Sequence, residues 1–136
     1  MKSIKYILIL FLAASISSCN SQQKKTTDTN TVVQVVGTEV FENLEESAQL
    51  IDIRTPEEYN EGYIKNAVNI NFFDDDFMEQ MSKLNKDEAL YIYCRSGGRS
   101  GSASDKLEEA GFTRVYDLGV GMRGWRKGKK PVTQNK

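Results

Sequence analysis

The chain of 136 residues is long enough for one domain with a single hydrophobic core, and its formal charge of −1 argues against nucleic-acid binding, which normally requires a basic face. The sequence has no histidine and two cysteines, which excludes Cys–His and Ser–His catalysis, histidine-ligated metals and zinc sites. We therefore expect no metal and no cofactor. Any catalysis must use a cysteine, carboxylates, arginines and backbone dipoles.

The first 18 residues are typical of a signal peptide. Lys2 and Lys5 precede the apolar segment YILILFLAASI (residues 6–16), which is too short to span a bilayer. Residues 16–19, ISSC, resemble the lipobox of bacterial lipoproteins. The resemblance implies cleavage before Cys19, an acyl chain such as palmitate on Cys19, and a domain anchored in the bacterial cell envelope, facing the periplasm or the cell exterior. The alternative is an ordinary signal peptide that leaves an N-terminal cysteine.

Residues 19–31 would then be the lipidated cysteine and a flexible tether, because residues 20–31 contain no apolar side chain. We expect the folded domain over residues 32–131, followed by a short tail, 132–136. A lipidated Cys19 cannot form a disulfide, so Cys94 would be a free thiol in a compartment where disulfides usually form.

The first half of the domain alternates between strands and helices. Residues 32–36 (VVQVV) form a β-branched strand, and residues 38–47 have helical apolar spacing behind a cap at Thr38. Residues 49–53 (QLIDI) form a second strand, followed by a helix with Pro56 in its first turn. A brief strand at 67–70 then leads to a helix over 74–84.

The second half continues the alternation. Residues 89–94 (ALYIYC) are apolar on both faces, as in a central parallel strand, and a helix over 100–110 ends at Gly111. A fifth strand, 114–118, precedes a short helix with Trp125, which we expect in the core or a pocket wall. This order predicts an α/β fold of three layers, a parallel sheet covered by helices on both faces. Cys94 ends a strand, at the edge where such sheets bind ligands.

The loop after Cys94 carries the chemistry. Gly97 and Gly98 let the backbone curl with its N–H groups inward, and the following helix adds its positive end. With charge from Arg95 and Arg99, this environment should lower the pKa of Cys94 and stabilise a thiolate that solvent can reach. The alternative, a cysteine that only fills the core, does not explain such a loop.

Three segments resemble single-domain rhodaneses, the sulfurtransferases: CRSGGRS (residues 94–100), DIRTPEEYNEGYIKNAVNI (52–70) and GFTRVYDLGVGMRGW (111–125). The resemblance implies a small α/β fold with a five-stranded parallel sheet. It also implies that Cys94 takes a sulfane sulfur from a donor such as thiosulfate, becomes a persulfide, and passes the sulfur to cyanide or a thiol. The partners would be a small anionic donor and an external thiol acceptor.

The resemblance also assigns roles around Cys94. Arg95 and Arg99 would bind the anionic donor, and the backbone N–H groups of this loop would stabilise the anionic sulfur. The residues that donate these N–H groups are Arg95, Ser96, Gly97, Gly98, Arg99 and Ser100. Asp52, Arg54 and Glu58 either rim the site and orient the loop or form structural ion pairs, and we favour the ion pairs.

The sequence departs from the family pattern in four places. Tyr63 replaces a usual histidine, Asn66 a usual glycine and Asn71 a frequent proline, while LGVGM (118–122) replaces a doubled glycine. None lies in the catalytic loop, so we expect tolerated surface or packing changes. The basic residues near the C-terminus either draw in anions or form a solvated end, and we favour the solvated end. They are Arg123, Arg126, Lys127, Lys129 and Lys130.

Two other functions compete with a sulfurtransferase. Cysteine phosphatases and arsenate reductases generally place five residues between cysteine and arginine, whereas four separate Cys94 from Arg99 here, a ring better suited to one sulfur atom. A persulfide carrier or partner-binding module without turnover would keep the same loop. Detection of sulfur on Cys94 without catalytic transfer would identify a carrier.

Overall fold

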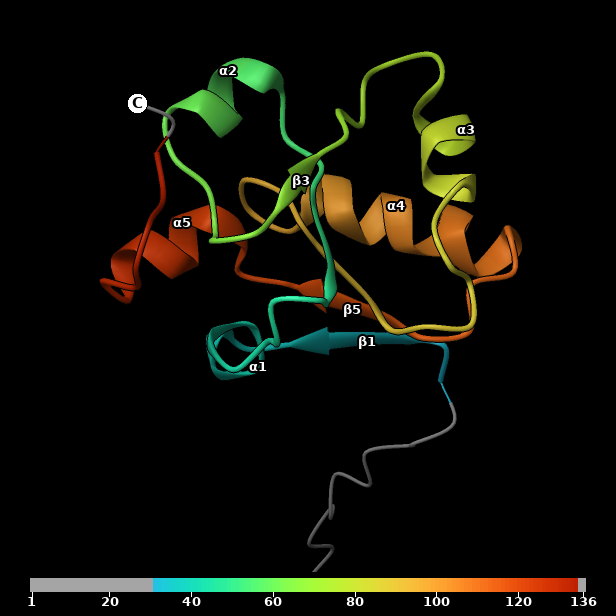
Figure 1. Cartoon of the computed structure of the whole chain (residues 1–136), viewed down its shortest axis with the longest axis horizontal. Helices are drawn as coiled ribbons and strands as arrows, with labels where there is room; N and C mark the ends of the chain where they lie inside the picture. Colours follow the sequence, from blue (N-terminus) through green and yellow to red (C-terminus); the bar gives the residue numbers. More distant parts are fainter. Residues whose placement is uncertain (1–30, 135–136) are drawn as a thin grey trace, which may run out of the picture.

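The computed structural model describes residues 31–134, so residues 1–30, which include the expected signal peptide, Cys19 and most of the expected tether, lie outside the described part. Among residues 31–134, five strands form one sheet in the order β1-β5-β4-β2-β3, with every neighbouring pair parallel. The strands are β1 (Val33–Val36), β2 (Gln49–Asp52), β3 (Val68–Asn69), β4 (Leu90–Tyr93) and β5 (Val115–Leu118). The predicted α/β fold, with β4 at the centre of the sheet, is confirmed (Figure 1).

In the described part of the chain, five helices are interspersed with the strands: α1 (Thr38–Glu42), α2 (Pro56–Asn60), α3 (Phe77–Ser82), α4 (Gly98–Glu109) and α5 (Gly121–Lys127). The predicted cap at Thr38 is wrong: Gly37 occupies the N-cap, with no side-chain hydrogen bond. α1 ends early because the Asn43 amide donates to the Glu39 carbonyl and satisfies an acceptor of the last turn. α4 begins two residues earlier than expected, inside the loop that follows Cys94.

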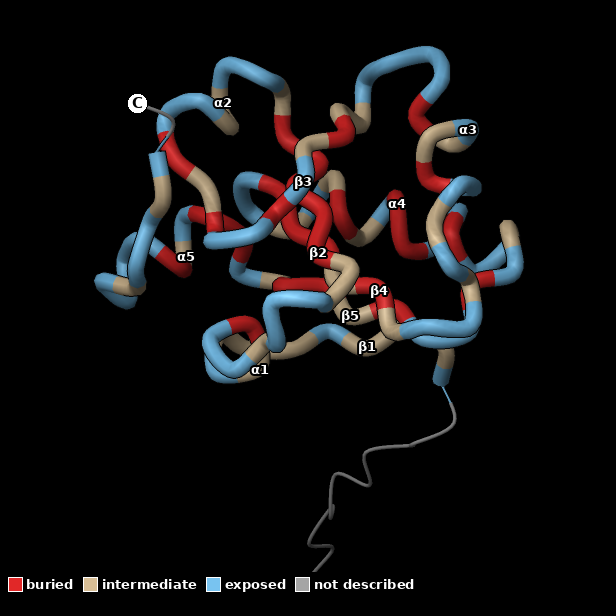
Figure 2. The backbone as a smooth tube through the Cα atoms, in the orientation of Figure 1, coloured by how far each residue is buried: buried red, intermediate tan, exposed pale blue. Residues whose placement is uncertain are grey.

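Each face of the sheet has its own apolar cluster. On one face α3 and α4 cover the strands through Phe77, Met81, Ala103 and Leu107. On the other face α1 and α5 do so through Phe41, Met122 and Trp125. Trp125 is 2% exposed, which confirms its predicted place in the core. Burial is concentrated along the central strands and the inner side of α4 (Figure 2).

Residues 133 and 134, which we expected to belong to a tail after Pro131, contact the domain. Thr133 pairs with Tyr63 in an antiparallel bridge, and the Gln134 amide donates to the Glu61 carbonyl. Among residues 31–134, no helix is long and apolar enough to cross a bilayer.

Candidate active site

Cys94 directly follows β4, and the loop after it surrounds the sulfur with donors. The Gly97 N–H donates to Sγ at 3.1 Å, and the Ser100 hydroxyl lies 3.5 Å from Sγ. Burial raises the pKa of Cys94, but hydrogen bonds from the Ser100 hydroxyl and from the N–H groups of Ser100, Ser96 and Gly97 outweigh it, so the pKa falls below its ordinary value. Hydrogen bonds, rather than arginine charge, dominate this activation.

Two glycines allow the loop to curl against the start of α5. Gly97 has φ 95°, and a Cβ there would meet the carbonyl oxygen of Gly119. Gly121 has φ 56°, and its Cβ would lie 2.6 Å from the backbone of Arg95 and Ser96. This close approach lets the Met122 N–H donate to the Cys94 carbonyl at 2.9 Å. The loop is therefore held by the helix behind it.

The sulfur is covered, contrary to the expectation of a thiol open to solvent. Cys94 is 1% exposed. The same amides that stabilise the thiolate enclose it, while Arg95 and Ser96 on the outside of the loop are exposed. The burial of Cys94 therefore limits how a donor can reach the sulfur.

The two arginines of the loop differ in their partners. Arg99 donates to both carboxylate oxygens of Glu58, at 2.7 and 2.9 Å, and its guanidinium lies 5.4 Å from the Phe73 ring centroid. This pair lowers the pKa of Glu58 and ties α4 to α2. Within residues 31–134, Arg95 has no ion pair, so its guanidinium is the one in the loop that is open to an anion.

Asp52 and Arg54 form the ion pair that we favoured. The Arg54 side chain donates to both Asp52 oxygens, with the shortest contact at 2.6 Å, and the two side chains are 3% and 0% exposed. Arg54 also donates to the Gly62 carbonyl at 2.8 Å. The pair therefore joins the end of β2 to the segment after α2, and Arg54 forms part of the wall of a groove beside the loop.

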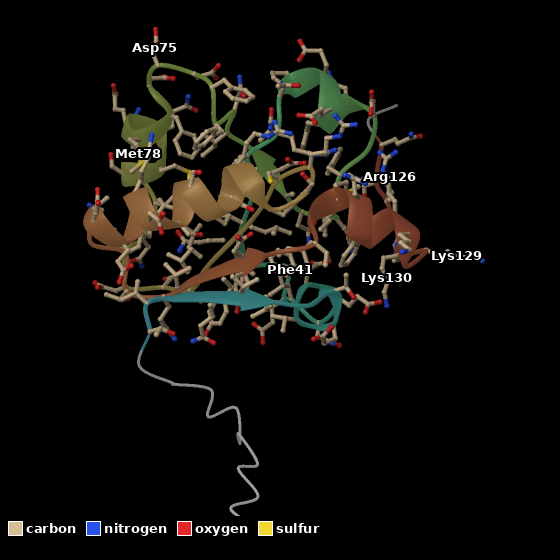
Figure 3. All side chains as sticks on the ribbon, turned by 180° about the vertical axis from the view of Figure 1, so that it is seen from behind. Phe41, Asp75, Met78, Arg126, Lys129 and Lys130 are labelled. Carbon is tan, nitrogen blue, oxygen red and sulfur yellow. The ribbon has the colours of Figure 1, made fainter. Side chains whose placement is uncertain are left out.

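That groove, of about 300 Å³, is rich in arginine. Its lining residues are Arg54, Glu58, Glu61, Arg95, Met122, Arg123 and Arg126. Arg126 donates to the Glu61 carbonyl at 3.0 Å and lies at the α5 end of the molecule with Lys129 and Lys130 (Figure 3). A larger cavity of about 430 Å³ is lined by Phe41, Leu50 and Trp125 but by no residue of the loop. The arginine groove is thus the hollow suited to an anion near Cys94.

The sequence reasoning missed Asp117. This residue of β5 is 2% exposed, and its Oδ1 has no hydrogen-bond partner in the described part of the chain. Burial raises its pKa, and a hydrogen bond with the Ser100 side chain lowers it only in part. The sequence did contain an indication of this residue, because an acidic residue within the strand segment VYDL is unusual in a sheet covered on both faces.

The sequence model of the rhodanese-like domain matches residues 37–128, so the chain belongs to this family. Among its relatives, thiosulfate sulfurtransferase 16 of Arabidopsis thaliana is 35% identical over 92 residues, 60% of this chain and 77% of that protein. A sulfurtransferase of Allochromatium vinosum is 37% identical over 87 residues, 64% of this chain and 79% of that protein. A rhodanese-like domain protein of Staphylococcus aureus superimposes with a TM-score of 0.65 at 29% identity, over 76% of this chain and 99% of that structure.

Proposed function

We propose that the protein is a sulfurtransferase that carries a sulfane sulfur on Cys94. The observation that supports this is the ring of donors around Sγ, which stabilises a thiolate without a basic side chain. The thiolate attacks the outer sulfur of a donor such as thiosulfate, and sulfite leaves with the electron pair of the broken S–S bond. An acceptor thiolate or cyanide then attacks the outer sulfur of the persulfide, and Cys94 leaves as a thiolate.

Arg95 and the arginine groove would position the anionic donor. The exposed Arg95 and Arg123 lie on the loop and on α5, where both line the groove. Neither guanidinium group forms an ion pair within residues 31–134, and two such groups suit a doubly charged oxyanion such as thiosulfate. In this proposal Arg99 does not bind the donor directly as predicted, because Glu58 already neutralises its charge.

The deciding experiment measures sulfite release from several sulfur donors and the mass of Cys94 afterwards. We expect catalytic sulfite release with cyanide or a thiol as acceptor, and the mass of one added sulfur on Cys94 when no acceptor is present. Cys94→Ser should abolish both while the circular dichroism spectrum stays unchanged. One sulfur added without turnover would indicate a carrier, and steady hydrolysis of p-nitrophenyl phosphate without sulfite release would indicate a phosphatase.

We also propose that Cys19 is lipidated and holds the domain at a membrane of the cell envelope. The support is the ISSC segment after an apolar stretch. Metabolic labelling with palmitate should mark the protein, and Cys19→Ser should abolish the label. An unlabelled protein cleaved at the same site would instead indicate an ordinary signal peptide.

A further inference from the structure

Glu58 places a negative charge in the wall of the arginine groove. Within residues 31–134, four arginines and two acids, Glu58 and Glu61, line this groove beside the Cys94 loop. The Glu58 side chain is 23% exposed, so the groove can be reached by its charge as well as by those of the arginines. An anion that enters the groove therefore meets a carboxylate as well as guanidinium groups.

The Glu58 carboxylate is held in place from two helices. Arg99 of α4 donates from Nη1 to Oε2 at 2.7 Å and from Nη2 to Oε1 at 2.9 Å. The Thr55 N–H, in the capping box of α2, donates to Oε2 at 3.1 Å. The pKa of Glu58 is lowered, chiefly by the hydrogen bond from Arg99, so the carboxylate is ionised at neutral pH.

Arg99 lies between two residues whose polar groups face the reactive sulfur. The Gly97 N–H and the Ser100 hydroxyl are 3.1 and 3.5 Å from Cys94 Sγ. A guanidinium at this point of the loop would attract anions toward the sulfur. The two-pronged pair with Glu58 compensates that charge instead.

We propose that Glu58 is a specificity-determining residue, which sets how strongly the site distinguishes anions of different charge. As a carboxylate it cancels the charge of Arg99; without it, Arg99 would add one positive charge beside the sulfur. An anion with two charges would gain twice the free energy of an anion with one. For sulfur donors this inference rests on the proposed function, whereas for other anions that react with the thiol it does not.

The first test compares alkylation of Cys94 by iodoacetate, an anion, and by iodoacetamide, which is neutral and of similar size. It uses the full chain carrying Cys19→Ser, which leaves one thiol. A change in the thiol pKa affects both reagents alike and cancels in the ratio of their rates. Glu58→Gln should raise the iodoacetate to iodoacetamide ratio about threefold, as expected for one unit charge acting through water over a few ångströms, and added salt should shrink this rise.

Glu57→Gln is the matched control, because Glu57 is exposed on the same helix and does not line the groove. It removes the same charge and should leave the ratio unchanged. An unchanged ratio in Glu58→Gln would refute the proposal. An equal rise in both variants would also refute it, since the effect would then come from net charge alone.

A second pair of variants covers the case in which Glu58→Gln does not fold because Arg99 is left without its partner. Arg99→Gln alone should lower the ratio, since Glu58 then faces the groove uncompensated. Adding Glu58→Gln to Arg99→Gln removes both charges and should restore the ratio of the unchanged chain. A double variant with the same low ratio as Arg99→Gln would overturn the proposal.

The second test uses two sulfur donors of different charge, thiosulfate with two and methanethiosulfonate with one. In each case the Cys94 thiolate attacks the outer sulfur, and sulfite or methanesulfinate leaves with the electron pair of the S–S bond. Glu58→Gln should raise kcat/KM about threefold for methanethiosulfonate and about ninefold for thiosulfate. Equal rises would refute a preference based on charge. No transfer from either donor to the unchanged chain would refute the proposed function instead, and the alkylation ratio would still decide the role of Glu58.

Discussion

At the scale of single residues, the site stabilises negative charge on one side chain and penalises it on another. Cys94 is surrounded by donors, whereas Asp117 is buried with one oxygen unpaired. The pKa of Cys94 falls below its ordinary value and that of Asp117 rises above its own. The difference arises from the backbone, because the N–H groups of the loop point at the sulfur and none points at the carboxyl in the described chain.

Asp117→Asn should stabilise the protein as the pH rises. The folded chain holds the Asp117 proton at pH values where the unfolded chain, with a pKa near 3.8, has released it. The stability that the protonated Asp117 carboxyl contributes is fully present below the unfolded pKa and is lost as the pH rises through the raised pKa of the folded chain. We expect the gain in unfolding free energy of the variant to grow by about 1 kcal/mol or more between pH 4 and pH 8. Urea unfolding at both pH values checks this, and a gain independent of pH would contradict it.

Arg95→Ala should weaken donor binding while it leaves the fold intact, because this guanidinium is exposed and free of ion pairs among the described residues. We expect the KM for thiosulfate to rise about fivefold, the effect of roughly 1 kcal/mol of charge-assisted hydrogen bonding, with little change in kcat. Lys127→Ala is the matched control, since Lys127 is exposed on α5 but does not line the groove. Equal KM values for the two variants would exclude Arg95 from donor binding.

At the scale of elements, the conformation of the loop after Cys94 depends on how α5 approaches it. Met122 and Arg123 donate backbone N–H groups to the carbonyls of Cys94 and Arg95, at 2.9 and 3.0 Å. Of the two adjacent glycines usual in the family, this chain keeps only the second, Gly121, which lies against the loop backbone. Val120 takes the place of the first, where φ is −81° and the side chain is 50% exposed, so a glycine is not required there. Asn66, in place of another usual glycine, has φ 68°, a conformation that asparagine tolerates.

Gly121→Ala should therefore disturb the site, and Gly101→Ala should not. An alanine at Gly121 has an unfavourable φ and collides with the loop, so we expect it to lower the unfolding free energy by more than about 1 kcal/mol and to reduce sulfur transfer. Gly101 lies inside α4 with open space where a Cβ would be, so alanine there should raise the unfolding free energy by about 0.5–1 kcal/mol. Similar effects at both sites would show that the contact with α5 is unimportant.

At the scale of the whole molecule, the sequence predicted the sheet and the nest of amides but missed, besides Asp117, two features that depend on distant segments. The nest is local, because a strand end, two glycines and a helix start lie within a few residues of each other. The Arg99–Glu58 pair joins residues 41 positions apart, and no local pattern indicates it. The position of the Cys94 loop likewise depends on the docking of α5, whose Met122 N–H donates to the Cys94 carbonyl and which is separated from Cys94 along the chain by α4 and β5.

Unfolding should change the selectivity of Cys94 toward reagents of different size. The native sulfur has a lowered pKa but is 1% exposed, whereas the unfolded thiol is ordinary and open. At pH 6, in the chain carrying Cys19→Ser, we expect the ratio of iodoacetamide to Ellman's reagent rates to be about tenfold higher in the native state than in urea. Equal ratios would mean that the loop does not shield the sulfur.

The common direction of the strands fixes where the reactive sulfur lies relative to the point at which the chain enters the domain. The strands of the sheet are parallel, so β1 begins at one end of the strands and Cys94, which follows β4, lies at the other end. Figure 1 shows where the chain enters β1. A four-residue strand of extended chain separates these two ends by roughly 13 Å. Any attachment upstream of Thr31 would therefore join the domain at the end of the strands opposite to the thiol.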